Sequence, residues 1–179
     1  MRAAALAWCL AAGLATAAAQ DARTPGAAGA EAAVVAYARA FTAGDRQAAA
    51  GMLDPVELKR FVGLLRTAAE LDDSGLFDVS DKAPPAQAFA DFLDAVMGAE
   101  PLYGEALGSL RAEVVGSVAE GDSLRHVVVR SRFDLDGEAV DAVALTTARW
   151  TGTRWVVTFD EKMRQFQRGI EAAVAARDE

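Results

Sequence analysis

Positive charge, cysteine, histidine and long apolar runs are all scarce in this sequence of 179 residues. The 18 Lys and Arg residues are outnumbered by 26 Asp and Glu, which leaves a formal net charge of −8 at pH 7. An acidic surface repels phosphate backbones and anionic lipid headgroups, so we expect no nucleic-acid partner. After Ala19, no apolar run approaches the roughly 20 residues that cross a bilayer, so we expect no membrane insertion.

Cys9 and His126 are the only residues of their types. Cys9 lies in an N-terminal segment that we expect to be removed, and its loss would leave no disulfide, thiolate nucleophile or thiolate metal ligand. One His is too few for the common zinc sites, which use several His or Cys ligands. The sequence also contains no Gly-rich phosphate loop. We therefore expect no metal and no cofactor, and we assign no catalytic residue.

Residues 1–19 have the pattern of a secretory signal peptide. Arg2 is followed by the apolar run 3–14 and by three small residues at 17–19. This arrangement predicts cleavage before Gln20. The abundance of Ala, and of Arg over Lys, is typical of a GC-rich bacterial genome. The predicted location is therefore periplasmic or secreted.

The rest of the chain reads as a leader and one domain. Residues 20–29 are rich in Ala, Gly, Thr and Pro without periodicity, which predicts a flexible leader before a single domain at 30–179. Helical spacing of apolar residues begins at 31–43 and continues in a short helix at 45–52. Further helices are expected after Asp54-Pro55 and after Pro84-Pro85, and a last one at 160–176, because capping residues or prolines precede apolar stripes there.

Four β-strands are expected between these helices and the last one. The runs 111–120, 123–135, 138–150 and 153–160 are separated by two-residue turns that contain Gly. Such short turns make tight hairpins, which predicts an antiparallel meander in sequence order. The expected fold class is α+β, with N-terminal helices packed on a curved four-stranded antiparallel meander and a C-terminal helix.

The turn positions also predict which residues share a face of the sheet. A turn at Asp136-Gly137 places Arg132 opposite Asp141 and His126 opposite Thr147, and the preceding turn places Glu113 opposite Arg130. The face that meets the helices should then be almost wholly apolar. The opposite face should carry charged residues around an apolar stripe, which consists of Val115, Val128, Val143, Leu145 and Val156.

The segment Val35-Ala36-Tyr37-Ala38-Arg39-Ala40-Phe41, with Ala43-Gly44-Asp45 after it, resembles the opening helix of the nuclear transport factor 2-like superfamily. The stretch from Val114 to Arg130 is similar to exported members of the same group. The resemblance covers about Ala30 to Asp160 and implies a cone-shaped α+β fold, shared with polyketide cyclases and ketosteroid isomerases. Because that fold hosts unrelated functions, it implies no activity for this chain.

Five residues are weak candidates for ligand binding. Tyr37 is expected on the helix-facing side, and Trp150 and Trp155 flank a tight turn, where they either stack on a ligand or close the core. His126 and Arg130 belong to the charged face, where cross-strand ion pairing is an equally economical explanation of the charges.

Three functions remain open at this point. The leading hypothesis is an exported, non-enzymatic domain that holds a small apolar ligand or a protein partner, because the inner face lacks a general base. The second is a periplasmic enzyme that uses His126 with Arg130 or Asp141. The third is a structural homodimer, since the outer apolar stripe invites burial against a second copy.

Overall fold

The computed structural model describes residues 22–70, 79–99, 106 and 109–176, and it confirms an α+β fold. The chain runs through helices α2 (Ala27–Thr42), α3 (Arg46–Gly51), α4 (Pro55–Ala69) and α5 (Pro85–Ala99), strands β1 (Arg111–Glu120), β2 (Leu124–Leu135), β3 (Glu138–Trp150) and β4 (Trp155–Val157), and helix α7 (Glu161–Ala175). The predicted signal peptide lies outside the described residues. None of the described helices is long and apolar enough to cross a membrane.

Short polar side chains begin three of the helices, as their sequence positions predict. Asp45 accepts a hydrogen bond from the Ala48 amide at the start of α3. Asp54 accepts from the amides of Val56 and Glu57 at the start of α4, where Pro55 lacks the amide that a first helical residue leaves unpaired. Capping of this kind satisfies amides that have no partner within the helix.

The sheet is a meander in the order β1-β2-β3-β4, with every neighbouring pair antiparallel. The hairpin of β2 and β3 turns at Asp136 and Gly137, whose φ angles of 54° and 77° are those that a two-residue turn with the twist of its strands requires. Arg132 therefore lies opposite Asp141 and His126 opposite Thr147, as predicted.

The β1–β2 hairpin differs from its prediction in two ways that cancel. The turn has three residues rather than two, because Ser123 belongs to it and not to β2. A bulge between Val114 and Gly116 then shifts the register back by one residue. Glu113 thus lies opposite Arg130 as expected, although the turn that was used to predict this pair was wrong.

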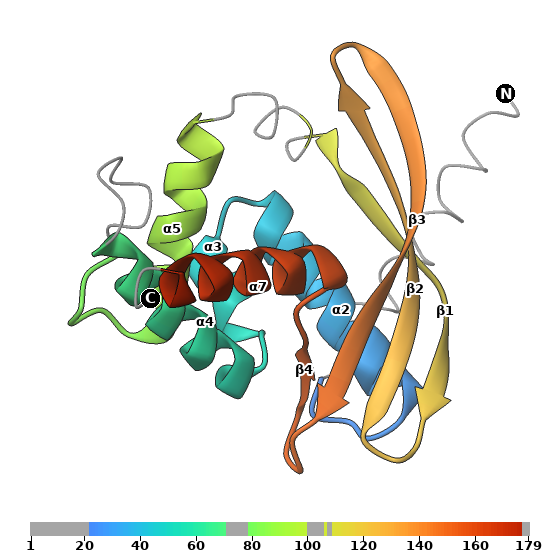
Figure 1. The fold of residues 1–179 in the computed structure, drawn as a ribbon. Coiled ribbons are helices and arrows are strands. Elements are labelled where there is room, and N and C mark those ends of the chain that lie inside the picture. Colours follow the sequence, from blue (N-terminus) through green and yellow to red (C-terminus); the bar gives the residue numbers. More distant parts are fainter. Residues whose placement is uncertain (1–21, 71–78, 100–105, 107–108, 177–179) are drawn as a thin grey trace, which may run out of the picture.

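The helices gather on one side of the curved sheet, and α2 lies against the strands (Figure 1). The far end of the β2–β3 hairpin extends beyond them. The core lies between the two layers. It includes Val127 and Ala148 from the sheet and Phe61 from α4, each 0% exposed.

The predicted flexible leader is wrong for residues 22–29. Helix α2 begins at Ala27, earlier than expected. The main-chain amide of Trp155 donates to the carbonyl of Ala22 at 2.9 Å, and its indole Nε1 donates to the carbonyl of Thr24 at 3.1 Å. A Cβ at buried Gly29 would lie 1.7 Å from that Thr24 carbonyl oxygen. Small residues without apolar periodicity look like a leader in sequence, but here they allow two backbone segments to approach closely.

Candidate functional site

The outer face of the sheet, the side turned away from the core, carries an exposed apolar patch. The patch consists of Val115, Val118, Val128, Val143 and Leu145, of which Val128 is half-buried and the other four are 59–64% exposed. The central strands place Val128 directly opposite Leu145. No described helix lies on this side of the sheet (Figure 1). Four of the five predicted stripe residues are therefore present, with Val118 added.

Val118 and Val156 correct the predicted stripe. Val118 joins the outer face because the longer turn pairs it with His126. Val156 was expected to be exposed there, but it is completely buried. The cause is a segment before α4 that runs beside β4: the amide of Asp54 donates to the carbonyl of Val157 at 2.8 Å, and the amide of Val157 donates to the carbonyl of Met52 at 2.9 Å. The outer edge of β4 is thus occupied by this segment.

His126 lies at one end of the apolar patch, between a carboxylate and a hydroxyl. Its Nε2 is 2.6 Å from Glu120 Oε2, and its Nδ1 is 3.0 Å from Thr147 Oγ1. Because an ionised carboxylate only accepts hydrogen bonds, Nε2 carries the proton. In the neutral ring, Nδ1 then accepts from the Thr147 hydroxyl. The three side chains form a short hydrogen-bonded chain across the sheet.

The observed partners of His126 are thus Glu120 and Thr147, not Arg130 or Asp141, which the enzyme hypothesis placed with it. Arg130 Nε lies 3.6 Å from Asp141 Oδ1, and Arg132 Nε lies 3.4 Å from Asp141 Oδ2, so these charges pair with one another. Thr147 was predicted opposite His126, but its hydroxyl was not recognised as a partner. Glu120 was missed because the predicted turn was one residue too short.

Trp150 and Trp155 form a cross-strand aromatic pair that closes the core. Their ring centroids are 5.6 Å apart. Trp155 is 4% exposed, and its indole nitrogen is already bonded to Thr24. This ring has almost no free surface on which a ligand could stack. The two Trp residues and Tyr37 pack with the core, whereas His126 and Arg130 lie on the outer face, so the structure does not bring the five candidates together.

Tyr37 is a poor general base, but the ionisation of its phenol depends on its burial beside the core. Burial, with a smaller contribution from the Asp160 carboxylate, raises the pKa of its phenol from 10.0 to about 12. The neutral phenol is thus favoured by the folded state. Its contribution to stability is complete below pH 10 and is lost as the pH rises towards 12, because the unfolded chain ionises first.

We expect this loss to appear in chemical denaturation at alkaline pH. Between pH 9 and pH 11, the free energy of unfolding of the natural chain should fall by about 1 kcal/mol more than that of a Tyr37→Phe variant. The Tyr37→Phe variant lacks only the titrating hydroxyl, so it is the matched control for the natural chain. Parallel pH profiles for the two proteins would contradict a raised pKa at Tyr37.

A hollow of about 360 Å³ opens at the far end of the outer face, where β1 begins and the β2–β3 hairpin turns. Charged side chains of both signs line it, namely Arg111, Arg132, Asp134 and Asp141, and the other lining residues are Ser109, Phe133, Ala139 and Val140. The hollow does not include His126, Glu120 or Thr147. The hydrogen-bonded chain of Glu120, His126 and Thr147 is therefore separate from this hollow.

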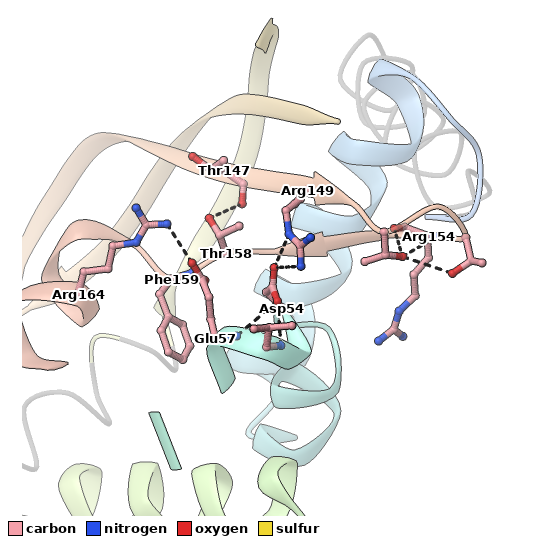
Figure 2. Close-up of polar contacts among 11 residues, drawn as sticks. Asp54, Glu57, Thr147, Arg149, Arg154, Thr158, Phe159 and Arg164 are labelled. Atoms are coloured by element: carbon pink, nitrogen blue, oxygen red, sulfur yellow. Dashed lines mark hydrogen bonds and ion pairs between the residues drawn. The ribbon is translucent and has the colours of Figure 1, made fainter. Parts of the chain in front are cut away.

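A buried carboxylate at the opposite end of the sheet joins the helical layer to the strands (Figure 2). Asp54 is 3% exposed; one oxygen caps α4, and the other accepts hydrogen bonds from Nε and Nη2 of Arg149 on β3. Beside it, Glu57 accepts from the Phe159 amide at 2.7 Å and from Arg164 at 3.2 Å. The capping role of Asp54 was predicted, but its partner Arg149 was not. The network holds α4, β3 and α7 together.

Comparisons with known proteins add no assignment. No known protein family matches the chain, and no curated protein sequence matches it significantly. The resemblance to the nuclear transport factor 2-like superfamily therefore stays a prediction. Within the described ranges, no three His, Cys, Asp or Glu side chains lie so that they could hold a metal ion together.

Proposed function

We propose that the chain is an exported, non-enzymatic interaction domain that pairs with a second copy of itself through the outer face of its sheet. The observation that carries the proposal is the apolar patch, in which four branched side chains are each about 60% exposed. Contiguous exposed apolar surface of this kind marks interaction sites in soluble proteins. Export rests on the predicted signal peptide.

The inner face is less suited to binding. Val127, Val129 and Ala148 are between 0% and 6% exposed, and they pack with residues of α2 in one core. Where α2 covers the sheet, side chains thus already fill the space that a small apolar ligand would need. The outer face offers apolar area without displacing any packed group.

A second copy is the occupant that the charges favour. A two-fold interface must be complementary to itself, so a rim of one sign would repel its own copy. The rim here is mixed: Arg130 and Arg132 lie beside Asp141, and Glu113 lies opposite Arg130. The whole chain carries a net charge of −8, so this balanced face is where two copies approach with little repulsion.

The test is the oligomeric state of the folded protein. We expect the natural chain to sediment as a dimer at micromolar concentration. Leu145→Lys should sediment as a monomer, because two ammonium groups would meet near the two-fold axis; the dissociation constant should rise by at least ~100-fold.

Val56→Lys is the matched control. Val56 is 70% exposed on α4, away from the outer face, so this variant introduces the same charge and should stay dimeric. Circular dichroism would show that both variants are folded. A monomeric natural chain would overturn the proposal, and a dimeric Leu145→Lys variant would exclude the outer face as the interface.

A further inference from the structure

The charges in the hollow at the far end of the outer face are incompletely paired. Arg111 on β1 lies directly opposite Arg132 on β2, and like charges in opposed positions destabilise a sheet. Arg132 shares the single carboxylate of Asp141 with Arg130. Among the described residues, the Arg111 guanidinium donates only to the carbonyls of Ser109 and Leu110, at 3.4 and 3.2 Å. Of these two neighbouring guanidinium groups, that of Arg132 therefore shares a carboxylate with Arg130, and that of Arg111 has no described carboxylate beside it.

Asp134, the second acidic side chain of the hollow, makes no ion pair with any described residue. Asp134 follows Arg132 by two residues on β2, so both point to the same face. Its main-chain amide donates a hydrogen bond to Ser109 Oγ at 2.8 Å. Neither the Asp134 carboxylate nor the Arg111 guanidinium has an ion-pair partner in the part of the chain that the structure describes. The hollow thus has a cationic wall and a separate acidic end.

We propose that this hollow binds a small zwitterion of the α-amino acid type. The ligand's carboxylate lies between Arg111 and Arg132, where it relieves their repulsion, and its ammonium group faces Asp134. Planar guanidinium groups match a carboxylate well. Ala139, which lies opposite Asp134 on the same face, gives the hollow an apolar portion for an aliphatic side chain, and its volume of about 360 Å³ suits a small ligand.

The balance of charges selects this class over its single-charge relatives. Arg111 and Arg132 are matched by Asp134 and Asp141, so the lining has no formal net charge. An anion without a positive group would be attracted by the two arginines but repelled by the two carboxylates. A cation without a negative group would be attracted by the carboxylates but repelled by the arginines. Only a molecule that carries both a positive and a negative group finds an oppositely charged side chain for each of them. Arg132 and Asp141 also belong to the rim of the proposed dimer interface, so we expect leucine to bind the Leu145→Lys variant as well.

The experiment compares three probes by isothermal titration calorimetry at neutral pH. Leucine carries both charges, N-acetyl-leucine only the carboxylate, and leucinamide only the ammonium group. We expect leucine to bind weakly, with a dissociation constant of about 1 mM. Each analogue should bind at least ~5-fold more weakly. Equal binding of leucine and N-acetyl-leucine, or no binding of leucine at several times that concentration, would overturn the proposal.

Variants locate the binding in the hollow. Arg111→Gln should weaken leucine binding about 10-fold, the loss of one charged hydrogen-bonding partner. Asp134→Asn should abolish the preference for leucine over N-acetyl-leucine, a result that general loss of structure would not produce. Arg168→Gln is the control: Arg168 pairs with Glu161 on α7, so its loss should leave binding unchanged. Unchanged binding in Arg111→Gln would refute this site, whether or not the chain is a dimer.

Discussion

Replacing Arg149 with Leu is expected to lower the free energy of unfolding by about 3 kcal/mol, because the substitution leaves a buried carboxylate without its cation. Asp54 is 3% exposed, and one of its oxygens would keep only the amides at the start of α4. The other oxygen would lose both hydrogen bonds from Arg149. Urea denaturation followed by far-ultraviolet circular dichroism measures the change.

A double-mutant cycle separates the ion pair from the helix cap. Asp54→Asn removes the charge but keeps a side-chain oxygen that caps α4, since Asn is as good an N-cap as Asp. Adding Arg149→Leu to Asp54→Asn should therefore cost much less than Arg149→Leu alone. Equal costs in the two backgrounds would mean that Arg149 stabilises the protein through its packing and not through Asp54.

Phe61→Ala is expected to destabilise the protein by about 4 kcal/mol, the cost of deleting a fully buried aromatic ring. Phe61 is 0% exposed. Its ring meets Phe89, Phe92 and Phe159 edge-to-face, with centroids 5.6, 5.7 and 5.4 Å away. These neighbours belong to α5 and to the segment before α7, so the cavity would loosen contacts among three parts of the fold. The midpoint of urea unfolding reports this loss.

Phe166→Ala is the matched control for the same deletion. Phe166 on α7 also contacts Phe61, with ring centroids 6.0 Å apart, but it is 39% exposed. Water fills the space left by an exposed ring, so we expect a loss of only about 1 kcal/mol. If the two variants were equally destabilised, Phe61 would not be the centre of the aromatic core.

The β2–β3 hairpin was predictable because a local signal fixes it. Asp136-Gly137 is a strong two-residue turn, and once it is placed, the alternation of side chains assigns every residue of both strands to a face. The β1–β2 hairpin has a weaker signal. Ser123 is as acceptable in a turn as in a strand, and no local rule places the bulge after Val114. The hydrogen bond between Glu120 and His126 depends on the length of this turn.

Contacts between distant segments account for most of the remaining differences. Nothing near Val156 in the sequence shows that the residues before α4 will run beside it. Arg149 likewise reads as one more charge on a sheet face, although it is 95 residues from Asp54 in sequence and bonded to it in space. The sequence identifies Asp54 as a helix cap, but which cation pairs with it, Arg149, is decided by how α4 packs against the sheet.

The hydrogen bonds from Trp155 to Ala22 and Thr24 have a consequence for the order in which the chain is made. Thr24 and Trp155 are 131 residues apart, so a ribosome releases α2 long before the strand that holds its N-terminal end. Until β4 emerges, α2 has neither those bonds nor the completed sheet against which it packs. Contacts between such distant residues also slow folding, because a long loop must close before they form. A nascent chain that stops short of Trp155 should therefore expose the apolar face of α2, which would make this helix prone to aggregation during synthesis.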